Sequence, residues 1–169
     1  MKSDYVSRAL KFANILAILF ANCYRCEDFE EAVASYNATH SRPLSCAHGV
    51  SRFVVMRADY VIKFDMPTPK SGFENGRAGN NQSEYYAYQT AVRCGMGHLL
   101  AESTLVTVGK FTVNIMPRIG GVSDDMRYWT DYCTDEEEDW LFDNICDLHY
   151  GNVGYRNGKV CVVDYAWVG

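Results

Sequence analysis

The chain has 169 residues, of which 48% are hydrophobic and 22% charged, so it is neither a disordered tail nor a fibrous repeat. That length suits one compact domain or two small lobes. A net charge of −5 argues against a nucleic-acid partner, and seven cysteines without a disulfide framework favour a reducing cytoplasm.

The first 49 residues are predicted to form a helical extension. The apolar run at residues 14–23 is too short to span a bilayer and is interrupted by asparagine, so we expect no membrane partner and no export signal. A second helix is predicted over residues 27–40, with an acidic first turn that suits the helix dipole. Helical spacing in the first helix predicts a buried face made of Val6, Leu10, Ala13, Ala17, Phe20 and Tyr24.

Residues 50–116 show strand patterns interrupted by one helix. The runs at 52–57 and 59–65 predict an antiparallel pair, and a second pair is predicted at 103–108 and 111–116. Between the pairs come a long loop at 66–81 and a helix at 82–94, with Ser83 as its cap and Gly95 as its stop.

The last part of the chain, 117–169, is predicted to hold two helices and a hairpin. The helices are expected at 123–132 and 134–145, the second with a threonine cap and a solvated acidic run at 135–139. The Asn157-Gly158 pair between two apolar runs predicts a tight hairpin turn. Together these elements predict an α+β fold.

The residues most suggestive of chemistry are the sequence DLHYGN at 147–152 and VVDY at 162–165. Asp147 follows a helix, Asn152 begins one strand of the hairpin, and Asp164 ends the other. We therefore expect the three side chains to meet at one end of the hairpin. A carboxylate and an amide oxygen, from Asp164 and Asn152, suit magnesium. Asp147 is then available to accept a proton from a hydroxyl group.

These motifs resemble the catalytic loop and metal-binding segment of the protein-kinase-like superfamily, including its aminoglycoside and small-molecule kinase branch. The resemblance covers roughly residues 50–169. It implies that Lys63, in the run YVIKF, contacts ATP phosphates and that Glu84 pairs with this lysine. It also implies that the run NIMPRIGG, with Met116, forms the hinge against adenine. ATP and magnesium are the cofactors that it implies.

The expected fold is therefore kinase-like, with a small antiparallel-sheet N-lobe at 50–116 and a much reduced helical C-lobe at 117–169 that carries a catalytic-loop hairpin. Residues 1–49 are expected to brace it. The sequence departs from the family pattern: no glycine-rich loop precedes Lys63, Ile145 and Ala166 replace family residues, and the given sequence ends five residues after Asp164. Gly72, Gly76 and Gly79 are candidate substitutes for the missing loop.

Two functions follow from the resemblance. The first is an ATP- and magnesium-dependent phosphotransferase acting on a protein or small-molecule hydroxyl group. The second is a pseudokinase, a catalytically inactive module that binds a protein partner of unknown identity and inhibits or modulates it. The compact chain resembles bacteriophage products, so the partner would then be a host protein and the location the host cytoplasm. The departures from the family pattern leave both functions open.

Single residues have plainer alternatives. Lys63 and Glu84 are also compatible with an ordinary strand lysine and a helix N-terminal acid, and Asp147 and Asn152 with a turn. A zinc site from Cys23, Cys26, Cys46 and His48 is a weaker alternative, because its two pairs of ligands differ in form.

Overall fold

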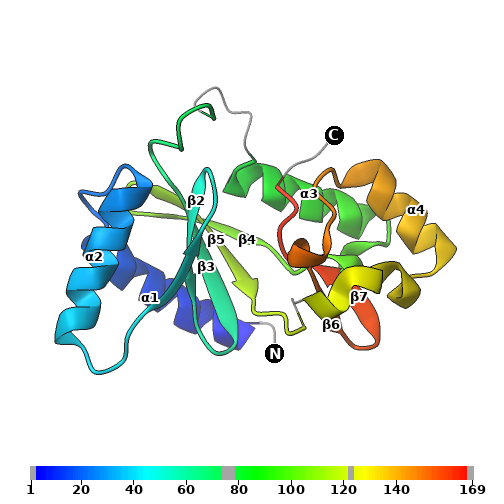
Figure 1. Ribbon diagram of the computed structural model, residues 1–169, viewed down its shortest axis with the longest axis horizontal. Helices are drawn as coiled ribbons and strands as arrows, with labels where there is room; N and C mark the ends of the chain where they lie inside the picture. The colour runs from blue at the N-terminus through cyan, green and yellow to red at the C-terminus, as the bar shows by residue number, and fades with distance from the viewer. Residues whose placement is uncertain (1–2, 74–78, 122–123, 167–169) are drawn as a thin grey trace. The chain divides into compact units, whose positions relative to one another are not determined.

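The computed structural model describes residues 3–73, 79–121 and 124–166. Within them lie four α-helices, a five-stranded antiparallel sheet and a two-stranded hairpin, so the predicted α+β class is confirmed (Figure 1). The chain divides into two compact units, residues 1–81 with 104–118 and residues 82–103 with 119–169. The domain boundaries expected at 49 and 116 remain a prediction.

The first unit is built on the sheet, whose strands run in the order β1-β2-β3-β5-β4. Both predicted antiparallel pairs are confirmed, and β3 joins them by pairing with β5. The edge strand β1 was not predicted. The strands are β1 (Ser45–His48), β2 (Arg52–Met56), β3 (Tyr60–Asp65), β4 (Thr104–Val108) and β5 (Phe111–Pro117).

One face of this sheet holds the hydrophobic core. Alternate residues of neighbouring strands point to the same side, and the cross-strand pairs Phe53–Phe64 and Ile62–Ile115 place these side chains together. Two helices, α1 (Ser3–Leu19) and α2 (Cys26–Thr39), cover this face (Figure 1). Five phenylalanine rings interlock within the core, at Phe20, Phe29, Phe53, Phe64 and Phe111.

Helix α1 is buried along a stripe that differs from the predicted one. Ala9, Ala13 and Leu16, together with Phe20 directly after the helix, are almost fully buried, whereas Leu10 is 37% exposed. The predicted stripe was therefore wrong at Leu10, and also at Tyr24, which lies beyond the helix and is exposed. The small side chains of Ala9 and Ala13 allow α1 to pack against the sheet. Helical periodicity alone does not distinguish such a buried alanine from an exposed one.

The second unit contains α3 (Asn81–Arg93), α4 (Asp135–Asn144) and the hairpin of β6 (Val153–Arg156) and β7 (Lys159–Val162), with Asn81 itself grouped in the first unit. Short 3₁₀ segments occupy Gly97–Leu99, Asp124–Tyr132 and Tyr150–Asn152. The second of these lies where a helix was predicted at 123–132, and it has the 3₁₀ form. Positive φ values of 54° at Asn157 and 78° at Gly158 confirm the predicted hairpin turn.

Two predicted helix ends were confirmed and one was wrong. Thr134 caps α4 as predicted, because its hydroxyl accepts a hydrogen bond from the Glu137 N–H. Gly95, with φ of 75°, follows the end of α3 as predicted. Ser83, however, lies inside α3, which begins two residues earlier, at Asn81.

No helix among the described residues is both long enough and apolar enough to cross a membrane.

Candidate functional site

The loop before the hairpin joins Asp147 directly to Asn152. The Asn152 Nδ2 atom donates to the Asp147 backbone oxygen at 3.0 Å and to its carboxylate Oδ2 at 3.2 Å. Both bonds use the amide nitrogen, which leaves the amide oxygen Oδ1 available as a ligand atom. Two of the residues predicted to share a site are therefore in contact.

Asp164 lies at the same end of the hairpin as Asn152. The pair Val153–Val162 ends the β6–β7 ladder, and the Val163 N–H then donates to the Asn152 backbone oxygen at 2.8 Å. Asp164 is the next residue. The prediction that Asp164 ends the strand was wrong by two residues, because β7 stops at Val162. Asp164 is half-buried, and Asp147 is exposed.

Hydrogen bonds of Tyr165 fix the segment after Asp164 to the rest of its unit. The Tyr165 N–H donates to the buried carboxylate of Glu84 on α3 at 3.3 Å, and the Tyr165 hydroxyl donates to the Ala101 backbone oxygen. Tyr165 is fully buried. Glu84 therefore holds the backbone beside Asp164 in place, a role that its predicted position at the start of a helix did not reveal.

Lys63 and Met116 lie in the first unit, on the neighbouring strands β3 and β5. Lys63 lies opposite Asn114 and Met116 opposite Val61, on the sheet face away from the phenylalanine cluster. Lys63 is 5% exposed and Asn114 is fully buried. Lysine and asparagine are seldom buried unless they are paired or hydrogen-bonded, so this face of the sheet carries buried polar side chains.

Asn114 on β5 and Asn81 at the start of α3 are buried polar residues that the sequence did not single out. Asn81 Nδ2 donates to the Lys63 carbonyl at 2.7 Å and to the Thr112 carbonyl at 3.0 Å, so it joins β3 to β5 at one end of their ladder. The Asn81 N–H also donates to the Asp65 carboxylate at 3.0 Å. These contacts are long-range, which is why local sequence patterns did not indicate them.

His149 shapes the loop that carries Asp147 and Asn152. Its Nδ1 atom accepts a hydrogen bond from the Gly151 N–H at 3.0 Å, so the neutral ring carries its proton on Nε2. That Nε2 lies 3.8 Å from the Asp147 carboxylate. A Cβ atom at Gly151 would lie 2.9 Å from the His149 ring, which explains the glycine at this position.

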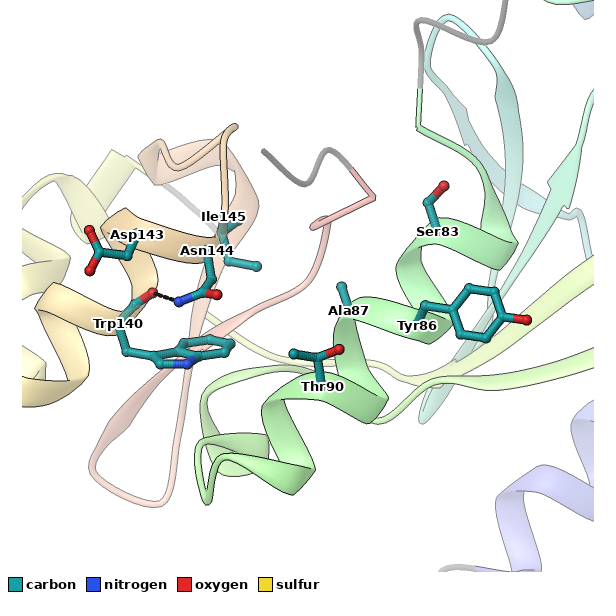
Figure 2. A pocket seen from close by; sticks show the side chains of 8 residues that line it. All are labelled: Ser83, Tyr86, Ala87, Thr90, Trp140, Asp143, Asn144 and Ile145. Carbon is teal, nitrogen blue, oxygen red and sulfur yellow. Dashed lines mark hydrogen bonds between the residues drawn. The ribbon is translucent and has the colours of Figure 1, made fainter.

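A pocket of about 370 Å³ lies between α3 and α4, apart from these residues. In Figure 2 the Trp140 indole extends from α4 toward Ala87 and Thr90 of α3. The Asn144 side chain donates back to the Trp140 carbonyl at 2.8 Å. None of the predicted site residues lines this pocket, which is formed by Ser83, Tyr86, Ala87, Thr90, Trp140, Asp143, Asn144 and Ile145.

The predicted substitutes for a glycine-rich loop are only partly visible. The connection between β1 and β2 consists of Gly49, Val50 and Ser51, and the Gly49 N–H donates to the Arg52 carbonyl at 3.0 Å. Of the three loop glycines, Gly72 and Gly79 are described and Gly76 lies outside the described residues.

No protein family and no curated protein matches the sequence. Two solved structures of WbdD are similar to it. One is described as the bifunctional kinase-methyltransferase WbdD, with a TM-score of 0.48 and 17% identity over 76% of this chain. The other is WbdD with the kinase inhibitor LY294002, with a TM-score of 0.45 and 16% identity over 76% of this chain. The chain spans about a third of the length of either, 34% and 33%.

Proposed function

We propose that the chain binds ATP with magnesium and transfers a phosphoryl group to a hydroxyl group of a protein or small molecule. The observation that carries the proposal is the amide of Asn152. Its nitrogen holds Asp147, its oxygen is available as a ligand atom, and its backbone fixes the residue before Asp164. The proposal is supported by the position of Asp147, Asn152 and the residue before Asp164 at one end of the hairpin.

The donor set fits magnesium, which favours one or two protein oxygens together with phosphate oxygens. Asn152 Oδ1 and the Asp164 carboxylate would hold the ion, and the ion would neutralise charge on the phosphates. Lys63 is assigned to the nucleotide phosphates and Met116 to adenine. Glu84 fixes the backbone of the segment that contains Asp164.

Asp147 is assigned the acceptor hydroxyl. Its exposed carboxylate is held by the Asn152 amide, which orients one oxygen and leaves the other for an incoming O–H group. In the transfer, the hydroxyl oxygen bonds to the terminal phosphorus, the bond from that phosphorus to the bridging oxygen of ADP breaks, and the hydroxyl proton passes to Asp147.

Thermal unfolding with and without magnesium-ATP tests the binding. At 100 times its dissociation constant, the nucleotide should stabilise the chain by about 2.7 kcal/mol. Asp164→Asn and Asn152→Ala should remove the magnesium-dependent part, whereas Asp143→Asn, in the separate pocket, should retain it. The absence of any stabilisation of the parent chain by magnesium-ATP would overturn the proposal.

Transfer is tested with labelled ATP and a panel of protein and small-molecule acceptors. Asp147→Asn should keep nucleotide binding but lower transfer about 10²–10⁴-fold, because the proton acceptor is lost. Equal transfer by Asp147→Asn and the parent chain would contradict the role of Asp147.

The pseudokinase remains a second candidate because the turn between β1 and β2 is so short. Three residues with one glycine offer few backbone N–H groups to cover phosphates. A chain that is stabilised by magnesium-ATP yet transfers no phosphate to any acceptor would support this candidate, a module that binds a protein partner.

A further inference from the structure

Helix α2 and strand β1 bring a thiol, a carboxylate and an imidazole together in the first unit. Cys26 and Glu30 are four residues apart on α2, so they share one face of the helix. His48 ends β1 and points to the sheet face that α2 covers, since it pairs with Phe53 of the core. Ligand atoms of the three side chains all lie within 4.8 Å of one another.

We propose that Cys26, Glu30 and His48 bind a zinc-class divalent cation. A thiolate and an imidazole favour zinc over magnesium or calcium, and a carboxylate oxygen is a common additional zinc ligand. Three protein ligands leave a fourth position for water or another small ligand. Binding releases the Cys26 thiol proton to solvent, because the thiolate is the ligand form.

The group formed by Cys26, Glu30 and His48 combines one buried ligand with two exposed ones, and solvent reaches it. Cys26 is 5% exposed, whereas the side chains of Glu30 and His48 are 53% and 34% exposed. A cavity of about 450 Å³ lies beside Cys26 and is also lined by Lys70. A cation can therefore reach the thiol from solvent, and the exposed ligands have room for the small movement that metal–ligand distances of about 2.0–2.3 Å require.

Lys70 competes with the cation for His48. Lys70 Nζ lies 3.2 Å from His48 Nδ1, while His48 Nε2 lies 3.0 Å from Glu30 Oε1. An ammonium only donates hydrogen bonds, so its contact requires Nδ1 to act as an acceptor. When Nε2 binds a metal, the neutral ring carries its proton on Nδ1 and the Lys70 contact is lost. Lys70 is exposed and can move into solvent.

The ligand set differs from the zinc site considered from the sequence. In the described part of the chain, the only close group of potential metal ligands includes Glu30 and omits Cys23 and Cys46. Glu30 was missed because the helix was predicted to begin at residue 27, which left Cys26 outside it; α2 begins at Cys26, and this places Cys26 and Glu30 on one helix face.

Zinc titration of the full reduced chain, in competition with a chromogenic chelator, tests the proposal. Cys26→Ser, Glu30→Gln and His48→Ala should each lower zinc affinity by about tenfold or more, since even indirect changes around metal sites cost about 10–100-fold. Cys94→Ser and Glu27→Gln are matched controls that should bind as the parent does. Lys70→Met should raise the affinity, because a competing positive charge is removed.

Cobalt provides a second readout that is specific for the thiolate. The parent chain should show a sulfur-to-cobalt charge-transfer band, and Cys26→Ser should lose it. Circular dichroism checks that each variant is folded. If Cys26→Ser does not fold, the Glu30→Gln and His48→Ala variants still test the site, because they change exposed side chains. Equal zinc affinity of the parent chain and the three ligand variants would overturn the site. Loss of binding in Cys46→Ser but not in Glu30→Gln would overturn this ligand set.

Discussion

Glu137 is a single carboxylate on which three parts of the second unit converge. Its oxygens accept hydrogen bonds from the Thr134 N–H at 2.9 Å, from His98 at 2.8 Å and from Lys159 at 2.9 Å. Burial by itself would raise the pKa of Glu137, but these bonds outweigh it and lower the pKa to about 2. The prediction of a solvated acidic run was therefore wrong at Glu137, which is 7% exposed.

Replacing Glu137 should make the free energy of unfolding depend less on pH in the acid range. The pKa of Glu137 is about 2 in the folded chain, against an ordinary value of 4.5. The ionised carboxylate therefore stabilises the fold fully above pH 4.5, and this stabilisation is lost as the pH falls toward 2. We expect Glu137→Gln to lower the free energy of unfolding at pH 7 by on the order of 3 kcal/mol. Urea unfolding at pH 7 and pH 3 measures this. Glu136→Gln, at an exposed neighbour, should change little, and an equal loss at both pH values would contradict the linkage.

Gly97 allows a close approach that no other residue would. A Cβ atom there would lie 2.8 Å from Val92 Cγ2 and 3.3 Å from the Val92 Cα. Because the second atom belongs to the backbone of α3, a rotamer change cannot relieve the contact. Gly97→Ala should cost about 1–3 kcal/mol of stability, as overpacking does. Gly49→Ala, where a Cβ atom meets nothing within 4 Å, is the control in the same urea titration. Equal stability of the two variants would contradict this account.

At the scale of elements, the β6–β7 hairpin depends on its two-residue turn. Both Asn157 and Gly158 have positive φ, which costs about 1–2 kcal/mol for an ordinary residue. Gly158→Ala should therefore destabilise the second unit by about that amount. It should also weaken amide protection in β6 and β7, as hydrogen exchange would measure. Gly120→Ala is the control, because Gly120 has open space and no positive φ. Unchanged protection in Gly158→Ala would contradict the role of the turn.

Elements with strong local signals were predicted correctly from the sequence. The hairpin turn, the threonine cap of α4 and the two strand pairs each depend on residues close in the chain. Strand β1 was missed because SCAH has no β-rich run and is ordered by pairing with β2. Helix α3 begins early because Asn81 bonds to carbonyls of β3 and β5, distant in sequence.

For the candidate site too, only the contacts between residues close in the chain were predictable from the sequence. DLHYGN placed Asp147 and Asn152 in one loop, and their hydrogen bond is present. The contact of Glu84 with the Tyr165 N–H joins residues 81 positions apart, and no local pattern encodes it. The predicted roles of Lys63, Met116 and Asp164 toward nucleotide and metal remain predictions.

Across the whole molecule, the seven cysteines are all free and differ in accessibility. Burial raises the pKa of Cys46, Cys133 and Cys161 to about 11. At pH 8 only about one such thiol in a thousand is ionised, and the thiolate is the reactive form. Cys94 and Cys146 are exposed.

Thiol labelling of the native chain at pH 8 should therefore proceed in phases. We expect Cys94 and Cys146 to react first, and Cys161 to react only as the chain unfolds. A disulfide-forming reagent with peptide mapping measures the order, and Cys94→Ser with Cys146→Ser should remove the fast phase. Labelling of Cys161 in the fast phase would contradict this picture.

The phenylalanine cluster of the first unit has an optical consequence. Trp129 and Trp140 belong to the second unit, whereas the described core of the first unit contains five phenylalanine rings and no tryptophan. Emission from Trp129 and Trp140 during denaturation therefore reports on the second unit, whereas far-ultraviolet dichroism reports on both units. The two signals, recorded on one unlabelled sample, distinguish a single cooperative transition from two separate ones.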